Sequence, residues 1–208
     1  MGNMEKKVGI IIGVLTLAIL GVTVVFLTRP ERSVDLSRLR GENEQVKGTM
    51  GAANVIVEFA DYECPACATS APILSGLVEK HGDKVLVVYR HFPIPGHKWS
   101  KLAALAAEAA GKQGKFWEMN DKLFATQEEW ADKNEEPREF FEGLAEELGL
   151  DKDKFKADVD SKEVTEKVTG DLADGVALGV SATPTFFVNG EEMVGGRSLT
   201  AWEELLKL

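Results

Sequence analysis

The longest apolar run of the chain lies near its N-terminus. Residues 8–27 carry no charged side chain and are rich in Ile, Leu and Val. A helix needs about 20 such residues to cross a hydrocarbon core of about 30 Å. The run therefore predicts a transmembrane helix after a short tail at residues 1–7. A cleaved secretory signal is the alternative, but the run is long for a signal core and no Ala-x-Ala site follows it.

The next segment has a different pattern. Residues 28–45 are polar, contain Pro30 and show no apolar periodicity, which predicts a linker. Residues 46–208 are then expected to form one domain. Within it, residues 54–60 read as a buried strand, residues 65–80 as a helix with one apolar face, and residues 84–91 as a second buried strand. Two strands joined by one helix make a βαβ unit with parallel strands.

A block of helical periodicity follows, and it predicts an inserted helical domain at about residues 97–165. A further helix is indicated by apolar residues at i+4 spacing up to Val176. Asn189-Gly190 separates two short predicted strands, residues 185–188 and 191–194, which is the signature of a two-residue hairpin, and a last amphipathic helix ends the chain. The expected fold class is α/β with a partly parallel sheet.

Composition narrows the classes of function. The 208 residues include 24 basic and 34 acidic side chains, a net charge of −10, and this acidic balance argues against a nucleic-acid partner. A hydrophobic content of 44% is enough for a globular core. The chain has only two cysteines, too few for the multiple disulfides of a small secreted scaffold.

Those two cysteines form the motif Cys64-Pro65-Ala66-Cys67 at the predicted start of a helix. Unpaired backbone N–H groups and the helix dipole at such a position stabilise a thiolate, which makes Cys64 the candidate nucleophile. Cys67 lies one turn further on, where it can attack a mixed disulfide between Cys64 and a substrate. The spacing predicts thiol-disulfide exchange.

Other uses of the cysteine pair are less consistent with the sequence. A structural zinc site needs two more ligands, but no second Cys-x-x-Cys and no His-x3-His pair accompany the three histidines. Copper delivery would need a Met or His cluster nearby. A purely structural disulfide would close a loop too short to constrain the unfolded chain. We expect neither a metal nor another cofactor.

Acidic residues surround the motif. Glu58 interrupts the first apolar strand, and alternation places it on the same interior face as Ile56 and Ala60. A buried carboxyl there would have a raised pKa and could exchange a proton with Cys67. The alternative is an edge or solvent-facing glutamate. Asp61 and Glu63 would oppose thiolate formation if they lie close to Cys64.

Four sequence segments carry a resemblance to a known family. In chain order they are V-I-V-E-F-A-D-Y-E-C-P-A-C, Y-R-H-F-P, A-A-G-K-Q-G-K-F-W-E-M and A-T-P-T-F-F-V-N-G. Together they resemble the DsbA-like thiol-disulfide oxidoreductases of the thioredoxin superfamily, from about Val46 to Leu208, and point to the membrane-anchored bacterial type. The resemblance implies a thioredoxin-like fold with an inserted helical domain, preceded here by one N-terminal transmembrane helix.

The same resemblance implies roles for individual residues. Cys64 matches the attacking cysteine, Cys67 the resolving cysteine and Glu58 the buried carboxylate. Pro184 matches a cis-proline that faces the disulfide, and the backbone of Thr183 would pair with the substrate while its side chain tunes the redox behaviour. Pro65 and Ala66 lie between the cysteines and would also tune the redox behaviour. Family members that are strong oxidants often have a histidine where this chain has Ala66.

The resemblance also implies a biological setting. The substrates would be exported proteins with cysteines, and a membrane redox partner would reset the disulfide. Four arginines follow the apolar run against two lysines before it, which by itself favours the opposite orientation. Because a long domain can be translocated regardless of charge, and because disulfides persist outside the cytoplasm, we expect a single-pass membrane protein with an extracytoplasmic catalytic domain.

Within the family, a disulfide-forming oxidase is the expected activity. An isomerase or reductase of the same fold, or a non-enzymatic metal-binding or interaction module, are the alternatives. Dedicated isomerases often carry a separate dimerisation domain, and the sequence shows none. A monomer is therefore expected.

Overall fold

The computed structural model describes residues 34–40 and 44–208, and the predicted membrane anchor at residues 8–27 lies outside the described residues. No helix within these two ranges is long and apolar enough to cross a membrane. The described chain is built around a five-stranded sheet with the strand order β1-β3-β2-β4-β5. The strands are β1 (Gln45–Gly48), β2 (Asn54–Ala60), β3 (Val85–His91), β4 (Thr185–Val188) and β5 (Glu191–Val194).

The predicted βαβ unit forms the centre of the sheet. Strands β2 and β3 are parallel and are joined by α3 (Pro65–His81), whereas the other strand pairs are antiparallel. Every residue of β3 is buried, as expected for a strand that is covered on both faces. Gly82 ends α3, and Pro65 occupies its first turn, where a missing N–H costs no hydrogen bond.

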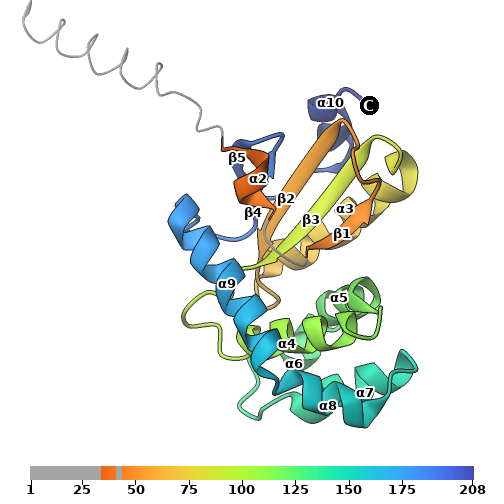
Figure 1. Cartoon of the computed structure of the whole chain (residues 1–208), viewed down its shortest axis with the longest axis vertical. Helices are drawn as coiled ribbons and strands as arrows, with labels where there is room; N and C mark the ends of the chain where they lie inside the picture. Colours follow the sequence, from red (N-terminus) through yellow and green to blue (C-terminus); the bar gives the residue numbers. More distant parts are fainter. Residues whose placement is uncertain (1–33, 41–43) are drawn as a thin grey trace, which may run out of the picture. The chain divides into compact units, whose positions relative to one another are not determined.

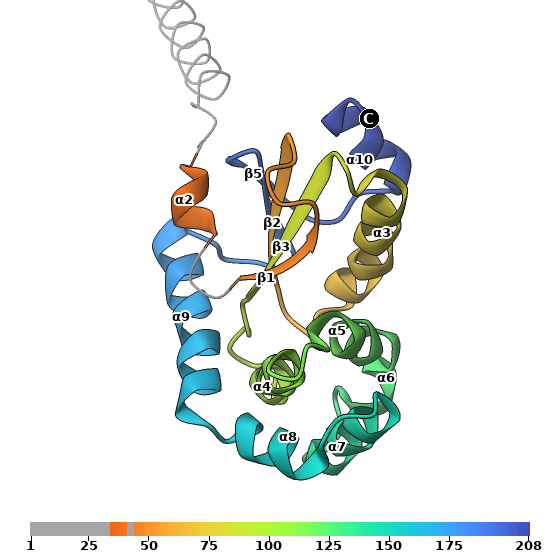
Figure 2. The ribbon, with the colours of Figure 1, turned by 45° about the vertical axis from the view of Figure 1, so that its right-hand side comes forward.

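Helices cover both faces of the sheet (Figure 2). On one face, α3 and α10 (Leu199–Leu206) pack against the even-numbered positions of β2 through Ile56, Leu77 and Trp202. On the other face, α9 (Lys162–Leu178) covers Val57 and Phe59. Alternation along β2 thus decides which helix each side chain meets.

The helical block lies at one end of the sheet (Figure 1). It comprises α4 (Ser100–Gly111), α5 (Phe116–Ala125), α6 (Gln127–Trp130), α7 (Arg138–Glu147) and α8 (Lys152–Val159), after which α9 returns along the sheet. Alanines on α4 allow close approach of α5 and α8, and Trp130, Phe141 and Phe155 fill the space between the helices. The structure thus contains the strand-free helical stretch that the periodicity predicts.

The end of the predicted linker at residues 28–45 differs from an unstructured tether. Residues 36–39 form the short helix α2 (Leu36–Leu39), and Leu39 is completely buried among the side chains that α9 covers. The buried guanidinium of Arg90 donates to the backbone oxygen of Leu39 at 2.7 Å and also to Asp171 and Asp174. A helix of one turn is too short to show apolar periodicity, which is why the sequence pattern did not indicate it.

The predicted hairpin joins β4 and β5. Asn189 and Gly190 both have positive φ values, 52° and 96°, as a two-residue turn of this type requires. The oxygen of Gly190 accepts a hydrogen bond from the N–H of Val34 at 2.8 Å. The turn therefore also holds the start of the described chain.

Two glycines of α9 should respond oppositely to alanine. A Cβ at Gly175 would lie 2.6 Å from Phe92 and 3.0 Å from Phe59, whereas a Cβ at Gly170 would meet nothing within 4 Å. We expect Gly175→Ala to destabilise the domain by about 1–3 kcal/mol through overpacking. Gly170→Ala should stabilise it by about 0.5–1 kcal/mol through helix propensity. Urea unfolding of the two variants tests this, and equal effects of the same sign would contradict it.

Candidate active site

Cys64 and Cys67 lie at the N-terminus of α3, and both are free thiols. Cys64 is the N-cap residue and is 7% exposed, whereas Cys67 is completely buried. The Sγ atom of Cys64 donates to the backbone oxygen of Thr183 at 3.3 Å, and the Thr183-Pro184 peptide is cis. Pro65 and Ala66 between the cysteines are exposed. Two segments 119 residues apart thus meet at the Cys64 sulfur.

The surroundings of Cys64 favour its thiolate. The hydrogen bond from the Cys67 thiol is the largest cause that lowers the Cys64 pKa, to about 5, and burial works against it. The Thr183 hydroxyl, buried with no other partner among the described residues, and the backbone N–H groups of Ala66 and Cys67 lower this pKa further. At neutral pH Cys64 is therefore ionised and no longer carries the proton that its thiol form donates to the Thr183 oxygen. The thiolate is the form that attacks disulfides.

The surroundings of Cys67 favour its protonated thiol instead. Burial raises the pKa of its thiol most strongly, and its hydrogen bond to Cys64 and the negative charge of Glu58 raise it further. Cys67 accordingly stays protonated next to the Cys64 thiolate. The pair is chemically asymmetric, because the slightly accessible Cys64 is charged whereas the completely buried Cys67 is neutral.

Glu58 lies on the central strand β2 and is only 3% exposed, so the edge or solvent-facing alternative is wrong. It shares its face with Ile56, as alternation predicts, and lies beneath α3. Burial raises the pKa of Glu58 to about 8, and the charge of Cys64 adds to the increase. A carboxyl with this pKa is neutral at pH 7 and can donate a proton.

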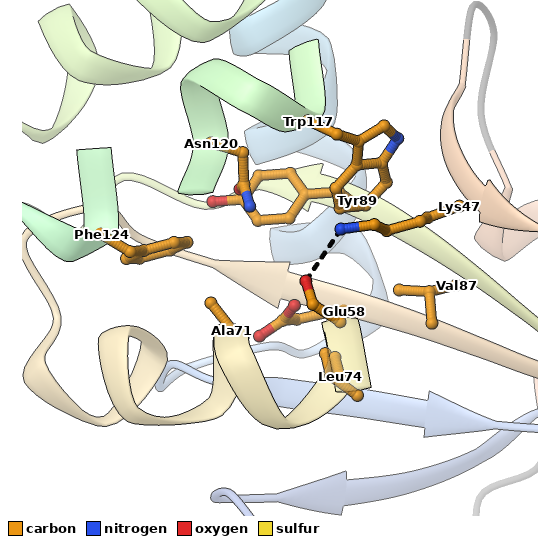
Figure 3. Close-up of a pocket in the computed structure, with 10 residues that line it drawn as sticks. Lys47, Glu58, Ala71, Leu74, Val87, Tyr89, Trp117, Asn120 and Phe124 are labelled. Carbon is orange, nitrogen blue, oxygen red and sulfur yellow. Dashed lines mark hydrogen bonds between the residues drawn. The ribbon is translucent and has the colours of Figure 1, made fainter. Parts of the chain in front are cut away.

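A small cavity adjoins Glu58 (Figure 3). Its volume of about 10 Å³ admits about one water molecule. Lys47 and Ser75 are among the residues that line it, and the Lys47 Nζ donates to the Ser75 Oγ at 2.8 Å. The hydroxyl of Tyr89, which also lines the cavity, is buried without a hydrogen-bond partner among the described residues. Polar groups of Lys47, Ser75 and Tyr89 thus line the cavity next to the buried carboxyl.

Asp61 and Glu63 have a different role from the one expected. Asp61 accepts hydrogen bonds from the backbone N–H groups of Glu63 and Ile94, the Ser100 hydroxyl and the His97 ring. Glu63 accepts from the N–H groups of Trp99 and Ser100, each at 2.6 Å, and so binds the N-terminus of α4. These donors stabilise both negative charges, and the strongest influences on the Cys64 pKa come from other groups.

Two residues at the site had not been predicted. Gln127, on α6, donates its side-chain amide to the backbone oxygens of Tyr62 at 2.6 Å and Cys64 at 3.2 Å. His97, in the loop before α4, contacts Asp61. Neither position shows a local sequence signal, because each reaches the motif from a distant part of the chain.

The arrangement offers no evident metal-binding geometry. Within residues 34–40 and 44–208, no group of three or more His, Cys, Asp or Glu side chains is placed to hold a metal ion. The site consists instead of a reactive cysteine pair, a buried carboxyl and a cis-proline loop. This combination on a βαβ sheet defines the class of thiol-disulfide oxidoreductases with a thioredoxin-like fold.

Comparison with known proteins agrees with that class. The family model described as thioredoxin matches residues 41–208, and the chain belongs to this family. A thioredoxin-like oxidoreductase from Silicibacter pomeroyi DSS-3 is 28% identical with a TM-score of 0.70, over 84% of this chain and 96% of that one. BdbD from Bacillus subtilis is 25% identical with a TM-score of 0.69, over 85% and 95% of the two chains.

The fold is also shared with α-DsbA1 from Wolbachia pipientis, with a TM-score of 0.72 at 22% identity, over 80% of this chain and 90% of that one. The resemblance to DsbA-like proteins that the motifs indicate is thereby confirmed.

Curated relatives are much longer. A protein named Na(+)/H(+) antiporter NhaA from Herminiimonas arsenicoxydans is 40% identical over 163 residues, 77% of this chain and 25% of that protein. One named Na(+)/H(+) antiporter NhaA 1 from Mycobacterium sp. (strain KMS) is 35% identical over 202 residues, 92% of this chain and 32% of that protein. The chain spans about a quarter to a third of the length of these relatives.

Proposed function

We propose that this chain is an extracytoplasmic thiol-disulfide oxidoreductase that forms disulfides in exported proteins. The asymmetric cysteine pair carries the proposal. A Cys64 pKa of about 5, against an ordinary value of 9.0, stabilises the reduced form at pH 7 by about a hundredfold. A pair whose reduced form is stabilised gives up its disulfide readily, which is the property of an oxidant.

The reaction begins with the disulfide between Cys64 and Cys67. A substrate thiolate attacks the Sγ of Cys64, and Cys67 leaves as a thiolate that takes the proton of Glu58. A second substrate thiolate then attacks the substrate sulfur of the mixed disulfide, and Cys64 leaves as a thiolate. The substrate dithiol has then lost two electrons to the cysteine pair. The low pKa of Cys64 makes this cysteine a good leaving group in the second step.

Glu58 recovers a proton before the next cycle, either from the Cys67 thiol when the disulfide re-forms or from solvent. The cavity beside it, which Lys47 and Ser75 help to line, offers a route through about one water molecule. The backbone of Thr183 and the ring of Pro184 would position the substrate segment beside Cys64, while exposed Pro65 and small Ala66 leave its approach open. No metal or other cofactor takes part in this mechanism.

The membrane setting forms part of the proposal. Residues 8–27 have the composition of an anchor, and relatives that match 92% of this chain are named as ion antiporters, an activity that requires a membrane. The domain would act as a monomer on the extracytoplasmic side, with a membrane redox partner that restores its disulfide. The predicted tail at residues 1–7 and linker would connect anchor and domain.

The equilibrium with glutathione decides the direction of the reaction. We expect a reduction potential more positive than about −180 mV, the value of a protein disulfide isomerase. The measurement uses the full chain in defined mixtures of reduced and oxidised glutathione at pH 7. A potential near about −270 mV, that of a thioredoxin, would overturn the oxidase assignment in favour of a reductase.

A further inference from the structure

His97 and Cys64 share a partner. The Nδ1 atom of His97 lies 2.8 Å from the Oδ2 atom of Asp61, while the backbone oxygen of Asp61 accepts the N–H of Cys64 at 3.1 Å. The Asp61 side chain is completely buried, and the His97 side chain is 34% exposed. Since an ionised carboxylate only accepts, the ring donates from Nδ1. A partly exposed titratable group is thereby held by Asp61, the residue whose backbone oxygen binds the N–H of Cys64.

We propose that His97 is a positioning residue whose imidazolium, held by Asp61, stabilises the Cys64 thiolate and releases part of its proton when Cys64 enters a disulfide. The proposal rests on the function proposed above, in which Cys64 cycles between thiolate and disulfide. His97 would supply from a separate loop the positive charge that Ala66 does not supply within the motif.

The charges that face His97 support this assignment. Burial lowers the pKa of His97, but the hydrogen bond and charge of Asp61 raise it, and the charges of Glu63 and Cys64 raise it further, so that it exceeds 6.5. Lys98, next in the loop, donates to the backbone oxygen of Asn134 and lies over the Trp99 ring. The groups that act on His97 from the neighbouring β2–α3 segment are therefore all anionic.

The electrostatic effect of Cys64 on the pKa of His97 is reciprocal by thermodynamic linkage. If the Cys64 thiolate raises the pKa of His97, protonated His97 lowers the pKa of Cys64 by the same free energy. The charge of Cys64 disappears in the disulfide, so the pKa of His97 must fall on oxidation, whereas the charges of Asp61 and Glu63 remain. A histidine that only holds the loop would show no such dependence on redox state.

The redox step itself is balanced. One glutathione disulfide oxidises the Cys64 thiolate and the Cys67 thiol, takes up one solvent proton and yields two glutathione thiols. Loss of the thiolate charge in the same step lowers the pKa of His97, so that His97 releases its proton in a fraction of the molecules. The equilibrium constant therefore gains an additional pH dependence near the pKa of His97.

NMR titration of His97 in the full chain tests the proposal directly. We expect its pKa to be about half a pH unit lower in the disulfide form and in Cys64→Ser than in the reduced wild type. In His97→Asn, the amide nitrogen replaces Nδ1 as donor to Asp61 while the charge is removed. The Cys64 pKa, followed by thiolate absorbance, should rise by about half a unit, and the glutathione equilibrium should shift about threefold toward the disulfide.

His81→Asn is the matched control. His81 ends α3 and pairs with Glu203, about 25 Å along the helix from Cys64, so its loss should leave the Cys64 pKa unchanged. A His97 pKa that is equal in the reduced form, the disulfide form and Cys64→Ser would overturn the proposal. Failure of the wild type to form a disulfide with glutathione would instead contradict the proposed function, and the comparison with Cys64→Ser would still test His97.

Discussion

Replacing Cys64 with serine is expected to reduce disulfide exchange at least about a thousandfold, because the hydroxyl cannot replace the thiolate that every covalent step uses. Cys67→Ala should behave differently. Its Cys64 keeps the backbone N–H groups of α3 and the Thr183 hydroxyl, so it can still attack a substrate disulfide, but nothing resolves the product. Reaction of each reduced variant with a model peptide that contains a disulfide, followed by thiol alkylation and mass spectrometry, measures both effects.

The mixed disulfide identifies the attacking sulfur. Cys67→Ala should accumulate a covalent adduct that survives non-reducing electrophoresis, and the double variant Cys64→Ser/Cys67→Ala is the matched control that should form none. An adduct on Cys67 in Cys64→Ser, with full exchange retained, would reverse the assignment. Complete burial of Cys67 makes that outcome sterically unfavourable.

Local patterns predicted the parts of the fold that depend on neighbouring residues. The apolar run around Glu58, the helix that starts at Pro65 and the Asn189-Gly190 turn all lie where periodicity and turn chemistry place them. Alternation alone was enough to put Glu58 in the interior. The thioredoxin-like arrangement of these parts, and the cis-proline at Pro184, came instead from the family resemblance, because no local signal distinguishes the isomer.

Long-range hydrogen bonds account for what was missed. Asp61 and Glu63 read as charges next to a nucleophile, yet they accept hydrogen bonds from groups in a loop and helix 33–39 residues further along the chain. Gln127 reaches Cys64 across 63 residues. The single turn of α2 accepts a hydrogen bond from buried Arg90 at the backbone oxygen of Leu39. Such contacts involve polar side chains that single-sequence periodicity treats as surface.

Glu58 couples the chemistry of the site to the stability of the domain. Its pKa is about 8 in the folded protein and 4.5 without burial, so between these values the folded state retains a proton that the unfolded state has released. The stability due to the neutral carboxyl is fully present below pH 4.5 and is lost as the pH rises through 8. The shift corresponds to a cost on the order of 5 kcal/mol for ionising the buried group.

Glu58→Gln should therefore stabilise the domain relative to the wild type by several kcal/mol at pH 9, with little difference at pH 4.5. Urea unfolding should use the disulfide form, because Cys64 does not titrate in a disulfide. In the reduced form, the low pKa of Cys64 would make stability increase with pH, opposite to the effect of Glu58. The charge of Cys64 also raises the Glu58 pKa, so the reduced form should show the larger difference between variant and wild type.

The same substitution should slow exchange on the order of a hundredfold at neutral pH, because an amide cannot protonate the departing Cys67 thiolate. Glu79→Gln, on the exposed side of α3, is the matched control and should change neither the pH dependence of unfolding nor the rate. Parallel stability curves for Glu58→Gln and wild type would show that Glu58 ionises without cost. A stabilised but slow variant would instead show that this interior carboxyl is kept at the expense of stability because proton transfer to Cys67 requires it.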